Sequence, residues 1–510
     1  MPAADTIAFL PFRRLRAVAA AIAALSALGP AVADPAAEAG RRLGELGFEP
    51  CTLAAEGLAL AVPAQCGTLD VPEDPERPLG RTLRLAVAWV PSEARRPEPD
   101  PVFVIAGGPG QSARESFPLA SPAFRAVLRR RHVVLVDQRG TGGSAPLACR
   151  ERPTATPVAS EPAGVVEAAQ RAAAECLDRA RALGLDPRFF TTREAVLDLE
   201  AVRRALGVPA VNLVGVSYGT RVALEYLRRF PAVTRTVVLN GVVPPGLALG
   251  AEHARNLDDS VRRQLAACGT QRACRERFGD PVATLEALHV DLQARPRDAS
   301  YRDSLTGEPR EGRLDAATLA GIVRLYAYVP QLAAMLPYTL GEAAAGRPAA
   351  LLAQAGMLES LVGERIYLGT QLSVTCSEDA PRIRPDPRDA GTLMGTTFVD
   401  ALLAQCAVWP RGRVPADARE PVRSDRPVLL LSGEFDPVTP PRYGEQVLAD
   451  LPRGRHLVAR GQGHDVLAAG CIPQLVATFV ERRGAADLDT GCLARLAATP
   501  PFAGPYGWEP

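Results

Sequence analysis

The chain has 510 residues, of which 47% are hydrophobic and 23% charged, and its formal net charge is +1. A chain of this length exceeds one ordinary hydrophobic core, so we expect two domains or one domain with a large insertion. All 58 basic residues are arginine, and they are interleaved with Asp and Glu. Neither nucleic acid nor an anionic membrane surface is therefore an expected partner.

The N-terminus has the pattern of an export signal. The basic stretch RRLR (13–16) precedes the apolar run AVAAAIAALSALGPAVA, and AVA (31–33) matches a small-x-small cleavage site. We predict a signal peptide over residues 1–33 and a secreted or periplasmic protein. The alternative is an uncleaved anchor, although the run is short for a membrane span. No later segment reaches 18 apolar residues without a charge, so we expect no stable membrane insertion after cleavage.

The ten cysteines indicate disulfides, because an even number in an exported chain is typical of a bridged fold. Zinc sites usually carry C-x-x-C pairs, and this sequence has none, so we expect no metal. The sequence does not fix the pairing. The simplest arrangement joins neighbours along the chain: Cys51 with Cys66, Cys149 with Cys176, Cys268 with Cys274, Cys376 with Cys406, and Cys471 with Cys492.

Short apolar segments alternate with amphipathic stretches through the first half of the chain. We expect strands at 82–91, 101–106, 132–136, 211–216 and 236–240, and helices at 114–130, 165–183, 192–206 and 220–230. This alternation predicts an α/β fold with a mostly parallel sheet and helices on both faces.

The alternation stops at about residue 246 and resumes at about residue 424. Between them the periodicity is mainly helical; strands at PVLLLSG (427–433) and HLVARG (456–461) and a helix at 473–482 then follow. We therefore predict a core in two parts, 34–245 and 424–510, with a large, mainly helical cap inserted at 246–423.

A serine between two glycines lies at the junction of a predicted strand and a predicted helix. In VNLVGVSYGTRVALEYL (211–227), Ser217 is flanked by Gly215 and Gly219. The glycines remove Cβ clashes, so the turn can be sharp enough to lift the serine above the carboxyl edge of the sheet. There the N-terminus of the next helix favours negative charge. This context indicates a nucleophile rather than a chance match in a glycine-rich chain.

A serine nucleophile needs a general base and a carboxylate to orient it, and after a turn of this type the acid precedes the histidine. Of the five histidines, His464 in the loop RGQGHDV after the last strand has the expected position. The loop GEFDPVTPP after the resumed strand offers Glu434 and Asp436. We predict Asp436, because the prolines make its loop rigid, with Glu434 as the alternative.

Two backbone N–H groups are expected to stabilise an oxyanion. One belongs to Tyr218, which follows the predicted nucleophile. We assign the other to Gly108 in FVIAGGPGQS, because glycines let the backbone approach a substrate; a plain turn is the alternative. In LVDQRGTGGS, Asp137 and Arg139 are candidates for an ion pair that braces these loops, with a catalytic role as the alternative.

The segments AGGPG, DQRGTGGS, GVSYGT, GEFDPVTPP and GQGH occur in the order seen in the prolyl and tripeptidyl aminopeptidase branch of the α/β-hydrolases. The chain resembles secreted members with a C-terminal extension named for tripeptidyl aminopeptidase. CAVWP (406–410) and a Cys471–Cys492 pair are similar to that branch too. The similarity covers most of the mature chain and is weakest across the cap. It implies a catalytic triad of Ser217, Asp436 and His464 that hydrolyses peptides from the N-terminus without a cofactor.

Two positions depart from this branch. Ala106 stands where many relatives have a histidine, and Asp465 stands where relatives often have a glycine; both bear on substrate fit. An aminopeptidase must also hold a free α-ammonium group, which calls for carboxylates near the mouth of the site. Glu378 in VTCSEDAP and Glu434 are the candidate substrate-binding residues, and a solvated surface acid is the alternative for each.

The leading hypothesis is a secreted serine hydrolase with aminopeptidase activity on peptides, acting through an acyl-enzyme. The runner-up is a carboxylesterase that uses the same triad on small acyl esters. The third is a pseudo-enzyme or binding module, which the presence of all three triad residues disfavours. The sequence indicates no partner besides the substrate and leaves the oligomeric state open.

Overall fold

A ten-stranded sheet forms the centre of the protein, with strand order β1-β2-β3-β4-β6-β5-β7-β8-β11-β12. The computed structural model describes residues 40–55, 59–149, 162–303, 306–362, 366–504 and 507, so the predicted signal peptide lies outside the described residues. The strands are β1 (Arg41–Leu43), β2 (Leu46–Ala54), β3 (Ala61–Pro72), β4 (Thr82–Val90), β5 (Val102–Ile105), β6 (Val133–Val136), β7 (Val211–Val216), β8 (Thr234–Asn240), β11 (Val428–Gly433) and β12 (Gly454–Ala459).

The strands from β6 to β12 in this order are all parallel, and those from β1 to β4 pair antiparallel. The parallel strands are short apolar runs such as VFVI and VVLV, every residue of which is buried. They confirm the predicted strands. The periodicity did not indicate β1, β2 and β3, because β2 and β3 contain proline and glycine, which the interior of a central strand rarely tolerates.

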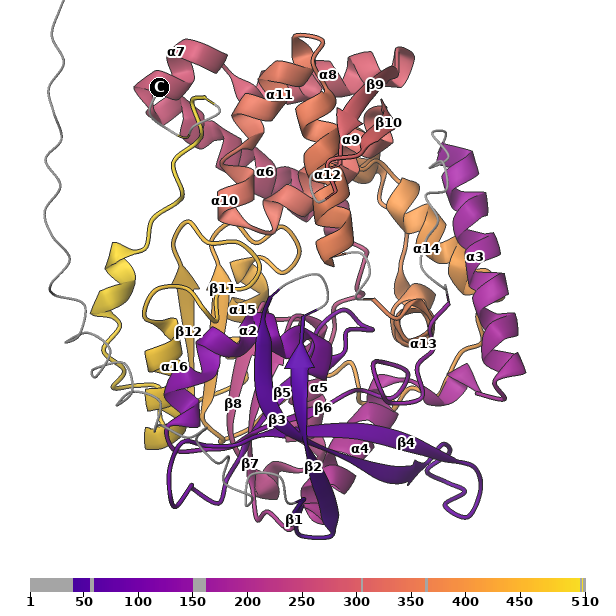
Figure 1. Ribbon diagram of the computed structural model, residues 1–510, viewed down its shortest axis with the longest axis vertical. Helices are drawn as coiled ribbons and strands as arrows, with labels where there is room; N and C mark the ends of the chain where they lie inside the picture. Colours follow the sequence, from indigo (N-terminus) through magenta and orange to yellow (C-terminus); the bar gives the residue numbers. More distant parts are fainter. Residues whose placement is uncertain are drawn as a thin grey trace, which may run out of the picture.

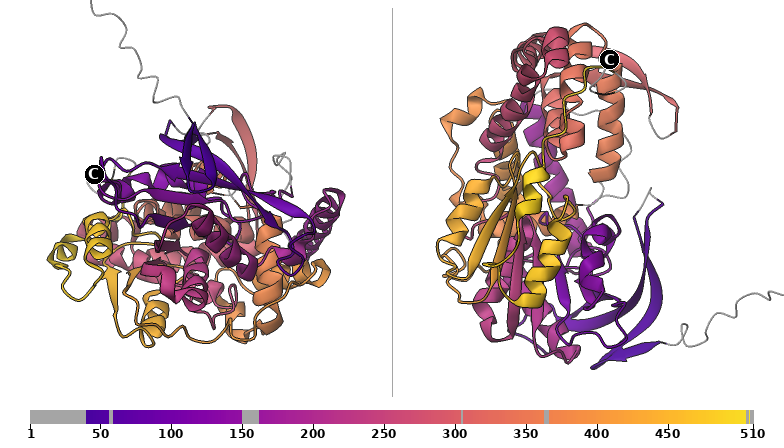
Figure 2. Two further views of the ribbon diagram at one scale, coloured as in Figure 1. Left: turned by 90° about the horizontal axis from the view of Figure 1, so that it is seen from below. Right: turned by 90° about the vertical axis from the view of Figure 1, so that its left-hand side faces the viewer.

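Helices cover both faces of the parallel sheet, as the sequence predicts (Figures 1 and 2). On one face, α2 and α16 pack against alternate residues such as Val102 and Val104. On the other, α4, α5 and α15 pack against the intervening residues such as Phe103 and Ile105. These helices are α2 (Ala113–Leu128), α4 (Thr192–Ala205), α5 (Tyr218–Arg229), α15 (Pro441–Leu448) and α16 (Ile472–Arg482).

The segment between β8 and β11 forms most of the remaining helices. Its first part has a hydrophobic core of its own and lies above the carboxyl edge of the sheet (Figure 1). We call this part the cap. It also contains a β-hairpin, which the sequence periodicity did not indicate. The cap consists of α6 (His253–Thr270), α7 (Arg272–Phe278), α8 (Pro281–Ala294), β9 (Arg297–Arg302), β10 (Pro309–Leu314), α9 (Ala316–Ala327), α10 (Pro330–Ala333), α11 (Leu336–Ala344) and α12 (Ala349–Val362).

The last two helices of this segment lie beside the core rather than in the cap. α13 (Leu368–Glu378) and α14 (Thr397–Val408) pack against α3 (Pro162–Ala182), and the three helices share a small apolar cluster. Two disulfides lie in that cluster, Cys149–Cys176 and Cys376–Cys406. The segment therefore closes over the sheet edge in one part and is anchored at the side of the core in the other.

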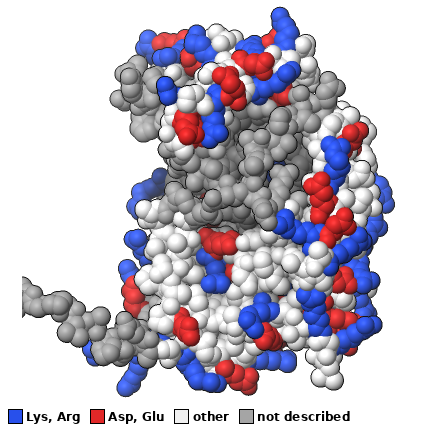
Figure 3. Space-filling view, turned by 45° about the vertical axis from the view of Figure 1, so that its right-hand side comes forward, with Lys and Arg blue, Asp and Glu red and all other residues white. Residues whose placement is uncertain are grey.

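All five disulfides join neighbouring cysteines along the chain, as the simplest arrangement predicts. Such bridges are typical of proteins that fold in an oxidising compartment, including the extracellular space. Among the described helices, none has the length and apolar character needed to cross a membrane. Positive and negative side chains are interspersed over the face in Figure 3, which agrees with the absence of a single-sign field.

Asp137 and Arg139 do not pair with each other, so that prediction is wrong. Asp137 accepts hydrogen bonds from Ser112 Oγ (2.6 Å) and the Gly143 N–H (3.0 Å). Arg139 forms a bidentate ion pair with Asp198 on α4, with N–O distances of 2.7 and 2.6 Å. Residues two apart share a face only while the chain stays extended, and here the chain turns at Arg139 just after β6, so the two side chains point to different elements.

Replacement of Asp198 by Asn is expected to destabilise the protein strongly. Arg139 and Asp198 are 1% and 4% exposed, so the variant leaves a buried guanidinium without its counter-charge, at a cost of about 3–5 kcal/mol in the free energy of unfolding. Denaturant titration measures this change. The control is Asp178→Asn, because the Asp178–Arg181 pair is exposed and should contribute less than about 0.5 kcal/mol. Equal stabilities of the two variants would contradict the prediction.

Candidate active site

Ser217 lies on a strained turn between β7 and α5. Its φ of 55° and ψ of −124° are unusual for a residue with a side chain, and such backbone strain is concentrated at functional sites. The neighbouring strand β5 lies so close to the start of α5 that a Cβ on Gly219 would lie 2.4 Å from the Ile105 carbonyl oxygen. The turn therefore requires glycine at that position, as the sequence analysis expects.

Asp436 and His464 form a hydrogen-bonded pair on the loops that follow β11 and β12. His464 Nδ1 lies 2.8 Å from Asp436 Oδ2, and Asp436 is fully buried. The other carboxylate oxygen accepts the N–H groups of Val438 and Thr439, both at 2.8 Å. The loop DPVTPP thus holds the carboxylate from its own backbone, which fits the rigidity that the prolines predict.

Thr439 is a site residue that the sequence analysis missed. Its hydroxyl lies 2.7 Å from Asp436 Oδ2 and 3.2 Å from His464 Nδ1, so it contacts both members of the pair. The signal in the sequence was its position three residues after Asp436, where a Thr hydroxyl can reach back to a carboxylate in a turn.

Asn240, at the end of β8, joins the serine turn to the histidine loop. Its carbonyl accepts the Ser217 N–H (2.8 Å), and its side chain bonds Asp465 Oδ1 (3.0 Å) and the Val466 N–H (3.2 Å). The next residue, Gly241, packs so closely that a Cβ there would lie 3.1 Å from His464 Cε1. Asn240 was not predicted as a site residue; its signal was an amide at the carboxyl end of the apolar strand TVVLN.

The loop after β5 lies against Ser217. A Cβ on Gly107 would come within 3.0 Å of Ser217 Cβ, and Gly108 has a φ of +103°, which favours glycine. Within the described chain, the N–H groups of Gly108 and Tyr218 donate to no acceptor. Five loops, after β5, β7, β8, β11 and β12, thus converge at the carboxyl edge of the sheet, where open α/β folds bind their ligands.

The family model described as the α/β hydrolase fold matches residues 100–469. The chain belongs to the α/β hydrolase family. Serine protease Hip1 of Mycobacterium tuberculosis (strain H37Rv) is 27% identical over 474 residues, which cover 85% of this chain and 88% of the relative. Tripeptidyl aminopeptidase of Streptomyces coelicolor is 28% identical over 482 residues, covering 86% and 85%.

A third relative of this hydrolase, carboxylesterase B of Mycobacterium tuberculosis (strain H37Rv), is 32% identical over 276 residues, which cover 48% of this chain and 51% of the relative. The full-length relatives bear the names of a serine protease and an aminopeptidase. Together with the family match, they identify the protein as an enzyme, a serine hydrolase related to peptidases.

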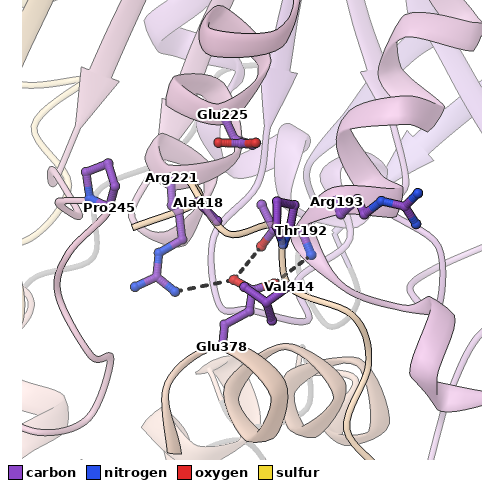
Figure 4. A pocket seen from close by; sticks show the side chains of 9 residues that line it. Thr192, Arg193, Arg221, Glu225, Pro245, Glu378, Val414 and Ala418 are labelled. Atoms are coloured by element: carbon purple, nitrogen blue, oxygen red, sulfur yellow. Dashed lines mark hydrogen bonds and ion pairs between the residues drawn. The ribbon is translucent and has the colours of Figure 1, made fainter. Parts of the chain in front are cut away.

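The carboxylate of Glu378 bonds to residues of α4 and α5, and no hydrogen bond joins it to Ser217 or His464 among the described residues. It accepts the N–H and the hydroxyl of Thr192 (2.8 and 2.9 Å) and lies 3.5 Å from Arg221 Nη1, beside a pocket of about 20 Å³ (Figure 4). Burial raises the pKa of Glu378 to about 7, even though the Arg221 charge opposes the shift. This acid therefore holds α4, α5 and α13 together.

Glu434 directly follows β11, two residues before Asp436, and is half-buried. One carboxylate oxygen accepts the Gly461 N–H at 2.7 Å, so the side chain ties the β11 loop to the β12 loop. The other carboxylate oxygen of Glu434 accepts no hydrogen bond from the described residues. In the described chain, no cluster of three or more His, Cys, Asp or Glu side chains is suited to a metal ion.

The cap contacts the site through Tyr328, which follows α9. Its ring packs edge-on against the His464 imidazole, with centroids 5.3 Å apart, and its carbonyl accepts the His464 N–H at 3.2 Å. Burial alone would lower the pKa of His464, but the charge and hydrogen bond of Asp436 outweigh it and raise the pKa above its usual 6.5. The four other histidines all have lowered pKa values.

We expect His464 to be the one histidine of the described chain that titrates above pH 6.5. In an Asp436→Asn variant the counter-charge is lost while the burial remains, so the pKa of His464 should fall below 6.5. Titration of histidine-labelled protein by NMR measures both values. A Glu434→Gln variant is the control, and its His464 pKa should stay above 6.5. A His464 resonance that is unmoved by Asp436→Asn would contradict the assignment.

Proposed function

We propose that this hydrolase is a secreted aminopeptidase that releases N-terminal residues or short peptides through Ser217, His464 and Asp436. The observation that carries the proposal is the buried Asp436–His464 hydrogen bond, held beside the strained Ser217 turn by Asn240. The relatives named serine protease and tripeptidyl aminopeptidase support the peptide substrate. The five disulfides support export.

In the proposed reaction, Ser217 Oγ attacks the substrate carbonyl while His464 Nε2 takes its proton. The N–H groups of Gly108 and Tyr218 stabilise the oxyanion. His464 then gives the proton to the leaving nitrogen, the C–N bond breaks, and an acyl ester remains on Ser217. Water attacks this ester by the same route reversed, releasing the acid and restoring the serine.

Thr439 has a positioning role in this proposal. Asp436 Oδ2 accepts both the Thr439 hydroxyl and the imidazole of His464, so the hydroxyl fixes the carboxylate in the plane where it orients the base. The raised pKa of His464 has a kinetic consequence. The base must be neutral, so kcat/KM of the free enzyme should fall as the pH drops through a value above 6.5.

A carboxylesterase that uses the same residues is the second candidate, and one observation favours it. A carboxylate that binds an α-ammonium group must be free to reach it, yet Glu378 is already bonded to Thr192 and Arg221. Glu434 retains one oxygen without a partner in the described chain and is the remaining candidate for that role. An esterase requires no such carboxylate, and one relative carries the name carboxylesterase B.

The first test compares an aminoacyl or tripeptidyl p-nitroanilide that has a free N-terminus with its N-acetylated twin, alongside a p-nitrophenyl acyl ester. An aminopeptidase should cleave the free-amine anilide at least about tenfold faster than the acetylated one, because a buried ammonium pairs with a carboxylate. Glu434→Gln should reduce that ratio, and the matched variant Glu378→Gln should not. Cleavage of the ester alone would identify an esterase.

Ser217→Ala should lower kcat for whichever substrate is cleaved by about 10⁴-fold or more, because the acyl-enzyme can no longer form. Retention of full activity by this variant would refute the assignment of the nucleophile and with it both candidate functions.

Thr439→Val should lower kcat/KM by roughly tenfold through the loss of one hydrogen bond to the Asp436 carboxylate, whereas Thr439→Ser should keep most of the activity. The readout specific to a positioning role is the pH profile: the acidic limb should shift in Thr439→Val and coincide with wild type in Thr439→Ser. Equal losses in both variants, with unchanged profiles, would show a purely structural role.

A further inference from the structure

Arg324, in the last turn of α9, is a half-buried cation that has no acidic partner among the described residues. Its guanidinium rests on the ring of Phe398, 5.2 Å from the centroid, and it forms no hydrogen bond or ion pair within the described chain. The other buried or half-buried arginines that the structure describes, apart from Arg426, each contact a carboxylate or a carbonyl.

The register of α9 directs Arg324 toward the candidate active site. Residues four apart lie on the same face of a helix, so Arg324 and Tyr328 are neighbours on one face. Tyr328 packs directly on the His464 imidazole. Arg324 therefore lies one helical turn from the residue that covers the proposed base, within the reach of an arginine side chain.

His253, the first residue of α6, gives a second indication that Arg324 lies near the candidate active site. Its imidazole packs at a tilt against Phe398 with centroids 5.3 Å apart, so His253 and Arg324 contact the same ring. Burial lowers the pKa of His253 to about 3, and the charges of Arg324 and His464 contribute to the shift. His253 is thus neutral and close to both cations. Its ring nitrogens have no partner in the described chain. Because the ring is neutral, it supplies no counter-charge to Arg324.

We propose that Arg324 binds a carboxylate of the substrate on the leaving-group side of the scissile bond. The guanidinium of Arg324 has no counter-charge among the described residues, and a carboxylate would complete its bidentate geometry. The leaving side follows from the position of Arg324 one helical turn from Tyr328, which packs on His464, because the base delivers its proton to the leaving atom. This inference rests on the proposed function. It adds that the preferred products carry a negative charge.

The carboxylate has two possible sources, an acidic side chain and the C-terminus of a short peptide. One peptide that the enzyme cleaves is therefore made in three forms, which differ after the scissile bond: Gln amide, Glu amide, and Gln with a free carboxylate. Wild type should show a kcat/KM about tenfold to a hundredfold higher for one charged form than for the neutral form, and that form identifies the source.

Arg324→Gln should abolish this preference and leave kcat/KM for the neutral form within about twofold of wild type, while Arg324→Lys should keep part of the preference. Arg426→Gln is the matched control, since Arg426 also lacks an acidic partner among the described residues but precedes β11, at the opposite edge of the sheet. It should keep the wild-type preference. Equal cleavage of all three forms by wild type, or a preference that survives Arg324→Gln, would overturn the proposal.

Failure of the proposed peptidase function gives a different result, because then no peptide is cleaved at all. In that case the same comparison uses acyl esters of 4-hydroxybenzoate and 4-hydroxybenzamide, whose leaving groups differ only in the carboxylate. A wild-type preference for the charged leaving group that Arg324→Gln removes would still support the subsite. Equal rates for the two esters would overturn it.

Discussion

The candidate site depends on the hydrogen bond between the buried Asp436 carboxylate and the His464 imidazole. A buried carboxylate is costly unless it is paired, and here two backbone N–H groups, the Thr439 hydroxyl and the imidazole all bond to it. The parallel sheet makes this possible, because β11 and β12 are adjacent and end at the same edge. The balance between burial and charge then raises the pKa of the histidine instead of lowering it.

The serine turn reaches this pair through β8, which lies between β7 and β11 in the sheet. Asn240, at the end of β8, bonds to the turn through its backbone and to the histidine loop through its side chain. One residue therefore fixes the relative position of two loops that are about half the chain apart. Asp465, which stands where members of the aminopeptidase branch often have a glycine, accepts a hydrogen bond from the Asn240 side chain. This contact gives the aspartate a structural role in this protein.

Buried charge serves two different purposes in this molecule. Most acids and arginines neutralise one another in structural pairs, such as Arg139 with Asp198 and Arg221 with Asp379. Glu378 belongs to this group, because Thr192 and Arg221 bond to it. Arg324 differs because no described acid neutralises it, although α9 brings it beside the residue that covers His464. The cap contacts the core through Tyr328. The charge of Arg324 is therefore free to bind a substrate in our proposal, because it is not neutralised in a structural pair.

The sequence by itself determined the parallel core, and it predicted a large insertion and the loops of the candidate site. Alternation of apolar runs with helices requires a covered parallel sheet, and such a sheet brings every strand's carboxyl end, with Ser217, Asp436 and His464, to one edge. Local glycine and proline chemistry also marked the serine turn and the rigid acid loop. Pairing of neighbouring cysteines was the simplest arrangement, and the structure has it.

Only the tertiary structure decided which side chains meet. Asp137 and Arg139 are two residues apart, yet each pairs with a residue distant in the sequence, because burial directs them to different elements. The role of Glu378 depends on the approach of α13 to α4, and those of Asn240 and Thr439 depend on loops from three strands. Contacts of this kind are set by packing between elements, and a single sequence carries no local pattern for them because the partners lie far apart along the chain.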